Sequence, residues 1–161
     1  VTQEWLKDIG KEKGTRVNQE YFIDKIGNRY DGTNATLIFD HTKYEESIAD
    51  WYAQTKHKNI KMLPRIVNPK GIKSADFIEE TSGISWEIKE PIGNTTDTTM
   101  LNQFKGQKEK AHNFIIDMHL SEMNDEIAIK EVIKIYSSKR YDWVEEVVLL
   151  RNKKVIKIFK R

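Results

Sequence analysis

Apolar positions recur at helical spacing in three segments of the chain. The segment 43–55 carries apolar side chains at i, i+4, i+7 and i+8, which predicts an amphipathic helix. A second helix is predicted over 95–112, because threonines that are good N-caps precede apolar residues on one helical face. The third predicted helix covers 124–138, with Asn124 as its N-cap.

Short apolar runs between these segments predict β-strands. Pro64 interrupts or ends one of them, because proline cannot donate a ladder hydrogen bond. Two further strands flank a turn around Thr81, Ser82 and Gly83, and a polar turn joins the last two strands of the chain. The predicted strands are 35–39, 59–67, two within 74–91, 113–120, 143–152 and 154–161. Their order with the helices predicts an α/β fold, a mixed central sheet flanked by helices.

The domain organisation follows from the change in composition near residue 35. Residues 1–34 are polar and Gly-rich, and we expect an N-terminal extension with a short helix at 4–10. Residues 35–161 are expected to form a single domain. Because the chain begins with Val1 rather than Met, we expect a domain cut from a longer polypeptide.

Composition and charge exclude several classes of protein. The 161 residues include no cysteine, which excludes a disulfide scaffold, a thiolate metal site and a cysteine nucleophile. No apolar run approaches the roughly 20 residues of a membrane span, so we expect no membrane association by this domain alone. The net charge of +2 does not imply a globally basic nucleic-acid binder. The basic, acid-free segment 151–161 is either a strand with solubilising lysines or one wall of a phosphate-binding groove.

Two acidic residues and a lysine lie within the strands of 74–91. If the turn centres on Thr81 and Ser82, paired residues have numbers that sum to 163, and Asp76 lies opposite Glu87. Lys89 then points to the same side as Glu87, because alternate residues of a strand share a face. The other face collects apolar side chains that would form the core: Ala75, Phe77, Ile84, Trp86 and Ile88.

Like charges opposite each other on a sheet are destabilising by up to about 1 kcal/mol, so this pattern needs an explanation. A divalent cation between the carboxylates would make the arrangement favourable, and paired carboxylates suit Mg²⁺. Lys89 could then orient water or balance charge on a phosphate. The alternative is a solvated polar face on which Lys89 pairs with one of the acids.

These residues resemble the PD-(D/E)xK nuclease motif, here "SADF" followed by "WEIKEP". The predicted order of elements from 43 to 119 is that of the PD-(D/E)xK core, and "EESIADWYAQT" supplies the helix acid that such nucleases often carry. More narrowly, "IKMLPRI", "GIKSADF", "WEIKEP" and "KAHNFIIDM" resemble the C-terminal tRNase domains of CdiA-type contact-dependent inhibition toxins, with related domains in phage-head and mobile-element proteins. The resemblance covers about 44–160.

The resemblance implies roles for individual residues. Glu46, Asp76 and Glu87 would bind a divalent metal, expected to be Mg²⁺ with Mn²⁺ or Zn²⁺ as alternatives, and with Lys89 they would form the catalytic set. The helix phase favours Glu46 over Glu45 only modestly. Two positions depart from the motif, since Ala75 replaces its proline and Lys110 stands where relatives often carry glutamine. The remaining candidates, for substrate binding, are Thr96, Thr98, Gln103, Gln107, Lys110 and His112.

The histidines form no pair at metal-ligand spacing along the chain. His41, His57, His112 and His119 are therefore each expected at the surface or at a strand end, and His112 is kept as a candidate phosphate contact. The segment 93–99 could contact phosphate through hydroxyls and a helix N-terminus. A plain N-cap is the favoured explanation, and both roles are compatible.

The resemblance implies a metal-dependent endonuclease toxin that hydrolyses RNA phosphodiester bonds, in particular those of tRNA. It also implies a cognate immunity protein, acidic enough to cover a basic groove. Such a domain would be the C-terminal part of a secreted or cell-surface-delivered bacterial protein and would act in the target-cell cytoplasm. The alternatives are a metal-independent ribonuclease toxin of the barnase/colicin type, a DNA-cleaving nuclease and a non-enzymatic binding module.

Overall fold

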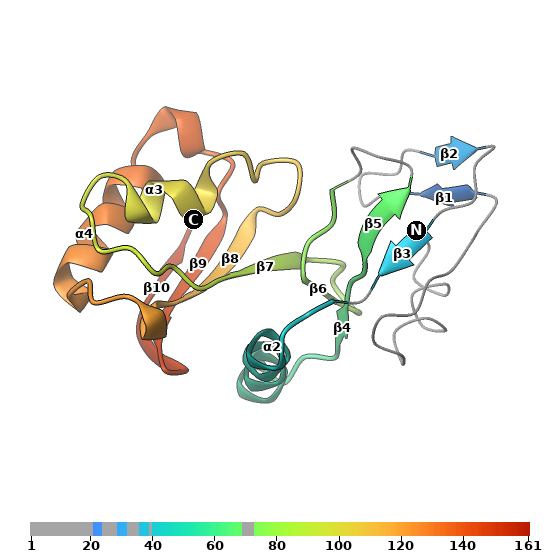
Figure 1. Cartoon of the computed structure of the whole chain (residues 1–161), viewed down its shortest axis with the longest axis horizontal. Helices are drawn as coiled ribbons and strands as arrows, with labels where there is room; N and C mark the ends of the chain where they lie inside the picture. Colours follow the sequence, from blue (N-terminus) through green and yellow to red (C-terminus); the bar gives the residue numbers. More distant parts are fainter. Residues whose placement is uncertain (1–20, 24–28, 32–35, 39, 69–72) are drawn as a thin grey trace. The chain divides into compact units, whose positions relative to one another are not determined.

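A computed structural model (Figure 1) describes residues 21–23, 29–31, 36–38, 40–68 and 73–161. Contacts within the chain divide it into two compact units, Val1–Ser85 and Trp86–Arg161. The predicted short helix at 4–10 and the turn expected at 68–71 fall wholly or largely outside the described residues. None of the described helices is long and apolar enough to span a bilayer.

The described residues of the first unit form one helix and three pairs of antiparallel strands. The helix, α2, spans Lys43–Lys56 and matches the predicted amphipathic helix. The strands pair as β1 with β2, β3 with β5, and β4 with β6. Their bounds are Tyr21–Ile23, Arg29–Asp31, Thr36–Ile38, Ile60–Met62, Arg65–Asn68 and Phe77–Glu79 for β1 to β6 in order.

Helix α2 begins and ends at residues with clear capping roles. The Thr42 hydroxyl accepts a hydrogen bond from the Glu45 backbone N–H at 3.1 Å, which satisfies one of the free donors of the first turn. His57 ends the helix in the left-handed conformation, with φ of 52°. Ile48 and Tyr52 are buried on one face, as their spacing predicts. The first turn of α2 is therefore fixed in place, and it carries a candidate ligand.

The predicted strand 59–67 is two strands, and Pro64 lies at the interruption as expected. β4 ends at Met62 and β5 begins at Arg65, with Leu63 and Pro64 between them. Leu63 lies outside both strands, and its N–H donates to the Asp76 carbonyl at 2.8 Å. This hydrogen bond ties the interruption to the segment just before β6.

The turn after β6 has the predicted register. Glu79 N–H donates to the Ile84 carbonyl at 2.8 Å, so the paired numbers sum to 163 as predicted. Gly83 takes φ of 75°, a conformation that favours glycine, and closes the turn. Of the five residues expected on the apolar face, four are buried, whereas Ile84 is 42% exposed because it sits at the end of the turn.

The second unit is built on four strands that pair in chain order. β7 (Ser85–Lys89), whose first residue belongs to the first unit, pairs in parallel with β8 (Asn113–Asp117), and β8 pairs in parallel with β9 (Glu146–Arg151). β9 and β10 (Lys154–Lys160) form an antiparallel hairpin with a bulge between Val155 and Lys157. The strands of the larger sheet follow the order β10-β9-β8-β7-β6-β4, so the predicted mixed α/β class is confirmed.

Two α-helices, α3 (Thr99–Phe104) and α4 (Asp125–Tyr136), pack against one face of these strands (Figure 1). The core beneath them is apolar, and Phe104 meets Phe114 edge to face with ring centroids 4.9 Å apart. α4 begins after Asn124, whose side chain accepts from the Glu126 N–H at 2.7 Å, as predicted. Short 3₁₀ turns at Met118–Leu120 and Lys139–Tyr141 follow β8 and α4.

The prediction of a continuous helix over 95–112 is wrong. The helix covers only Thr99–Phe104, because left-handed residues stand on both sides of it: Asp97 with φ of 70° and Gly106 with φ of 74°. The Asp97 N–H donates to Glu131 on α4 at 3.0 Å, so the preceding residues are tied to another helix instead of extending α3. Tertiary contacts override local propensity here.

A buried aspartate organises the end of β8. Asp117 is fully buried and accepts backbone hydrogen bonds from His119, Asn152 and Lys153 at 3.0, 2.9 and 2.9 Å. The last two donors form the β9–β10 turn, where both residues take positive φ. The predicted strand 113–120 therefore ends at Asp117, because its carboxylate binds the turns on either side.

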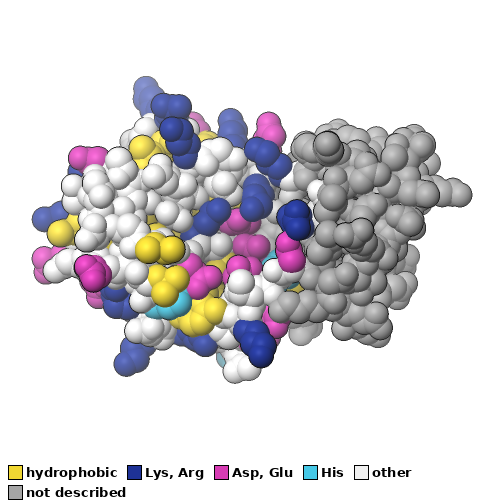
Figure 2. All heavy atoms as spheres, viewed as in Figure 1, with side chains coloured by type: hydrophobic (Ala, Val, Ile, Leu, Met, Phe, Trp, Pro, Cys, Tyr) yellow, Lys and Arg dark blue, Asp and Glu magenta, His cyan; other side chains and the backbone are white. Residues whose placement is uncertain are grey.

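The surface carries both signs of charge. Figure 2 shows basic and acidic side chains interspersed over the described part of one face, in agreement with a net charge of only +2. Every residue of β10 except Ile156 and Phe159 is exposed. Charge distribution alone therefore does not locate a nucleic-acid surface.

Candidate functional site

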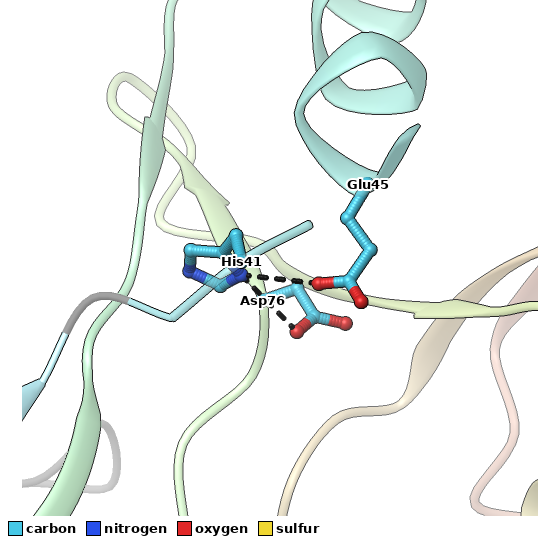
Figure 3. A group of neighbouring side chains, drawn as sticks. All are labelled: His41, Glu45 and Asp76. Carbon is cyan, nitrogen blue, oxygen red and sulfur yellow. Dashed lines mark hydrogen bonds and ion pairs between the residues drawn. The ribbon is translucent and has the colours of Figure 1, made fainter. Parts of the chain in front are cut away.

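Three potential ligand side chains meet in the first unit, as Figure 3 shows. His41 Nδ1 lies 3.4 Å from Glu45 Oε2 and 3.7 Å from Asp76 Oδ1. One donor atom from each of the three residues lies within 4.8 Å of the others. We call this group the histidine–carboxylate cluster. Among the described residues it is the group of three whose geometry suits a metal ion.

Backbone hydrogen bonds to Leu63 hold the cluster in place. His41 Nε2 lies 2.7 Å from the Leu63 carbonyl, and the Leu63 N–H donates to the Asp76 carbonyl at 2.8 Å. Glu45 is in the first turn of α2, which Thr42 caps. The cluster is therefore positioned by the interruption between β4 and β5 and by the start of a helix.

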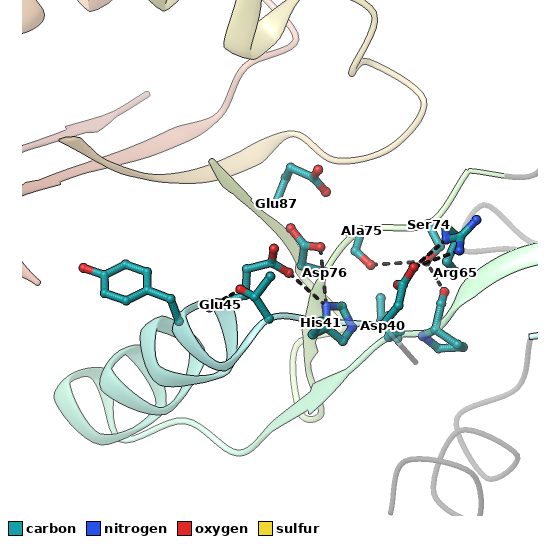
Figure 4. Close-up of polar contacts among 12 residues, drawn as sticks. Asp40, His41, Glu45, Arg65, Ser74, Ala75, Asp76 and Glu87 are labelled. Carbon is teal, nitrogen blue, oxygen red and sulfur yellow. Dashed lines mark hydrogen bonds and ion pairs between the residues drawn. The ribbon is translucent and has the colours of Figure 1, made fainter. Parts of the chain in front are cut away.

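Further polar contacts flank the cluster (Figure 4). Asp40 accepts from Arg65 Nε at 2.9 Å, and the Ser74 hydroxyl donates to the Pro64 carbonyl at 2.6 Å. These contacts join the segments on either side of His41 and Asp76. They restrict how far the two side chains can separate, although the Asp40–Arg65 pair is exposed and contributes little stability by itself.

Burial and opposite charge act against each other at His41. Burial lowers its pKa, but the hydrogen bond to Glu45, the Leu63 carbonyl and the charge of Asp76 outweigh it, so the pKa of His41 is raised above 6.5. The hydrogen bond to His41 also lowers the pKa of Glu45 below 4.5, against the effect of burial. Without a metal, the two carboxylates therefore favour the protonated form of His41.

The structure brings Glu45, rather than Glu46, into the histidine–carboxylate cluster. From the sequence, the helix phase favoured Glu46 over Glu45 only modestly. A capping hydroxyl at Thr42 and a histidine at i−4 from Glu45 are the features that distinguish the two acids. We therefore take Glu45 as the α2 ligand candidate.

A second group of charged residues lies in the second unit. Glu87 is 2% exposed, and its Oε1 lies 2.6 Å from Lys110 Nζ and 3.2 Å from Lys89 Nζ. Its Oε2 is buried and has no hydrogen-bond partner among the described residues. We call this group the glutamate–lysine cluster. A buried carboxylate with one free oxygen is a suitable ligand for a hard cation.

Strand alternation explains why Glu87 is buried. In the parallel register, Glu87 is level with Phe114 and Lys89 with Ile116, so both side chains point to the face covered by α3 and α4. Lys110 follows α3 and comes just before β8, which brings its ammonium group over the same face. The alternative interpretation of the strand pattern required a solvated polar face on which Lys89 pairs with an acid. Lys89 does pair with Glu87, but Glu87 is buried and not solvated.

The other predicted site residues have varied surroundings. Thr96 and Thr98 are exposed, and Thr98 makes no side-chain cap hydrogen bond. Gln103 donates to the Thr99 carbonyl of its own helix at 2.9 Å, whereas Gln107 Oε1 is buried without a partner among the described residues. His112 is exposed, and its Nε2 lies 2.9 Å from the Lys108 carbonyl. Their role in substrate binding stays a prediction.

Sequence reasoning missed His41. It was expected at the surface or a strand end, but its side chain is only 9% exposed. The available signal was the spacing in "HTKYE", which places a histidine four residues before a glutamate at a capped helix start. Nothing in the sequence brings Asp76 to the same place, because that contact depends on the hydrogen bonds to Leu63.

Comparison with solved structures identifies a similar fold. The chain superimposes on a chain of the "CdiA-CT/CdiI toxin and immunity complex from Burkholderia pseudomallei" with a TM-score of 0.51 and 16% sequence identity. The match covers 73% of this chain and 83% of that chain. No protein-family model matches the sequence, and neither does any curated protein. At this identity the likeness concerns the fold alone.

Proposed function

We propose that this chain is a metal-dependent endonuclease domain that hydrolyses RNA phosphodiester bonds, with tRNA as its substrate. The observation that carries the proposal is Glu87, a buried carboxylate with a free oxygen, held by the lysine that follows it in the Glu-x-Lys motif. The PD-(D/E)xK resemblance adds Asp76, and the histidine–carboxylate cluster adds Glu45.

The residues fit a divalent cation. Carboxylate oxygens with few other partners are the donors that such ions take from proteins, and two carboxylates and an imidazole already converge around Asp76. A bound metal would polarise the phosphate and lower the pKa of a water molecule. Glu45 and Asp76 would hold it, and the PD-(D/E)xK resemblance implies Glu87 as a further ligand. Glu87 Oε2, which is buried without a hydrogen-bond partner among the described residues, supports Glu87 as a ligand in this proposal.

In this proposal, Lys89 supplies a positive charge next to the reacting phosphate. Its side chain is 20% exposed and its ammonium group lies 3.2 Å from Glu87 Oε1, so Lys89 contacts both the carboxylate and solvent. There it would orient the attacking water and stabilise the charge that grows on the phosphate oxygens. Water attacks phosphorus and loses a proton to solvent, the bond from phosphorus to the leaving oxygen breaks, and that oxygen takes up a proton from solvent.

The biological setting of the proposal comes from the neighbour with the similar fold. That structure is a toxin and immunity complex, and we propose the same roles here: a C-terminal toxin domain delivered to a target cell and neutralised by a cognate immunity protein. The lysine-rich strand β10 favours an acidic immunity protein, by charge complementarity.

The test is a cleavage assay with total tRNA and duplex DNA, each with Mg²⁺, with Mn²⁺ or with EDTA. We expect tRNA cleavage that needs metal and is reduced at least 100-fold in Lys89→Ala. Lys139→Ala removes an exposed lysine and should cleave like the unmodified chain. Cleavage that persists in EDTA would instead support the metal-independent ribonuclease, and loss of duplex DNA alone would support a DNA nuclease. A folded sample that cleaves neither substrate would refute the nuclease proposal.

A further inference from the structure

The ring nitrogens of His41 have different surroundings. Nε2 is 2.7 Å from the Leu63 carbonyl, which can only accept, so Nε2 carries a hydrogen. Nδ1 faces the carboxylates of Glu45 and Asp76 at 3.4 and 3.7 Å. In the neutral imidazole this leaves a lone pair on Nδ1, directed toward two acceptors.

Three acceptors that meet in a partly buried place repel one another unless a cation lies among them. The side chains of His41, Glu45 and Asp76 are 9%, 25% and 18% exposed, so solvent screens their repulsion only partly. Two cations could occupy this place. One is a proton on Nδ1, and the other is a metal ion bound by all three residues.

The geometry fits the metal ion. Donors around a tetrahedral ion with bonds of about 2.0–2.1 Å lie roughly 3.3 Å apart. The His41 distances of 3.4 and 3.7 Å are close to this value, and no pair of donors exceeds 4.8 Å. The Nε2–H hydrogen bond to a backbone carbonyl is the usual outer contact of a metal-binding histidine, since it fixes the tautomer and the ring orientation.

We propose that His41 is a metal ligand, together with Glu45 and Asp76, and that this donor set selects Mn²⁺ or Zn²⁺ over Mg²⁺. Imidazole nitrogen binds Zn²⁺ and other transition-metal ions well, whereas Mg²⁺ prefers oxygen donors and retains its waters. The catalytic use of this ion rests on the proposed function. Its binding does not, because all three ligands belong to one unit and the ion can be titrated without RNA.

The test is an equilibrium titration of the full chain at pH 7.5 with MnCl₂, ZnCl₂ and MgCl₂, followed by calorimetry and, for Mn²⁺, by electron paramagnetic resonance. We expect Mn²⁺ to bind at least 10-fold more tightly than Mg²⁺. His41→Ala should weaken Mn²⁺ binding 10-fold or more and change Mg²⁺ binding less than 3-fold. His57→Asn is the control, because it removes an exposed histidine while asparagine tolerates the left-handed conformation at that helix end.

The opposite result has a distinct physical meaning. If His41 serves instead as a protonated counter-ion, His41→Ala frees two carboxylates, and the affinity for both Mn²⁺ and Mg²⁺ rises. A rise, or no change, would overturn the proposal. Since His41→Ala could impair folding, the unmodified chain labelled with ¹⁵N-histidine provides a second test. Bound Mn²⁺ should show hyperfine coupling to one histidine nitrogen, and its absence would also overturn the proposal.

Metal titration and the cleavage assay together distinguish loss of the metal site from loss of nuclease activity. Lys89→Ala should bind Mn²⁺ like the unmodified chain yet fail to cleave tRNA. His41-dependent Mn²⁺ binding without any cleavage would leave the metal site standing and refute the nuclease. Metal-dependent cleavage with Mn²⁺ affinity independent of His41 would leave the nuclease standing and refute the ligand.

Discussion

Replacing the lysines of the glutamate–lysine cluster should reveal how strongly the buried Glu87 depends on them. Lys110→Met and Lys89→Met keep much of the apolar stem and remove the charge. Each ammonium group is 2.6 or 3.2 Å from Glu87 Oε1, close enough for about 5–6 kcal/mol of attraction at an effective dielectric constant of 20. Desolvation offsets most of this, so we expect each single replacement to cost about 1–2 kcal/mol of unfolding free energy.

The double replacement should cost more than the sum of the two. After one lysine is removed the other still neutralises Glu87, which is 2% exposed, but removal of both leaves a buried carboxylate without a counter-charge. Breaking a buried pair in this way costs about 3–5 kcal/mol. We therefore expect a coupling of roughly 1–3 kcal/mol between the two positions. Glu87→Gln in the double variant should restore about 2 kcal/mol, because the amide needs no counter-charge.

Urea denaturation followed by tryptophan fluorescence, in EDTA at pH 7.5, measures these differences. Lys139→Met, at an exposed lysine, is the matched control and should change stability by less than about 0.5 kcal/mol. Additive losses at the two lysines, or no rescue by Glu87→Gln, would refute the dependence of the buried Glu87 on its two lysines.

Three further outcomes follow from other contacts. The pKa of His41 is raised and that of Glu45 is lowered, so their pairing should stabilise the metal-free chain from a pH below 4.5 to a pH above 6.5. In denaturation curves, His41→Asn should therefore lower the unfolding free energy more at pH 6 than at pH 9. An equal loss at the two pH values would contradict this. Tyr52→Phe removes the 2.5 Å hydrogen bond to buried Glu79 and should lower the unfolding free energy by about 1–3 kcal/mol, with Tyr44→Phe as a comparison at a less buried site. Asp117→Ala should lower the unfolding free energy by about 3 kcal/mol or more, because three backbone N–H groups lose a charged acceptor. A decrease in melting temperature of less than about 2 °C would contradict the role of Asp117 in holding the two turns.

Much of the fold could be predicted because local signals agreed with the final structure. The apolar spacing of α2, the capping residue Asn124 and the interruption at Pro64 each act over a few residues, and the structure confirms all three. The helix over 95–112 failed for the opposite reason. Its ends are set by Asp97 and Gly106 in left-handed conformations, and contacts with α4 hold the first of these.

The candidate site divides in the same way. Alternation along β7 was enough to place Glu87 and Lys89 on one face, since that depends on strand geometry alone. The spacing of His41 from Glu45 was a local signal, but the position of the His41 ring also depends on the Leu63 carbonyl, 22 residues further along the chain. The contact of Lys110 with Glu87 likewise depends on the chain's path after α3.

The pairing of β7, β8, β9 and β10 in chain order has a consequence for how the second unit folds. The β9–β10 hairpin closes over the two residues Asn152 and Lys153, so it can form in about 1–10 μs, well before the parallel pairs. β8 can pair with β9 only after the chain between them, which contains α4, has closed into a loop. We therefore expect the hairpin to be the nucleus on which β8 and then β7 assemble, with folding φ-values near one in its turn and lower in β7. The buried Glu87 would be the last part of this unit to become ordered.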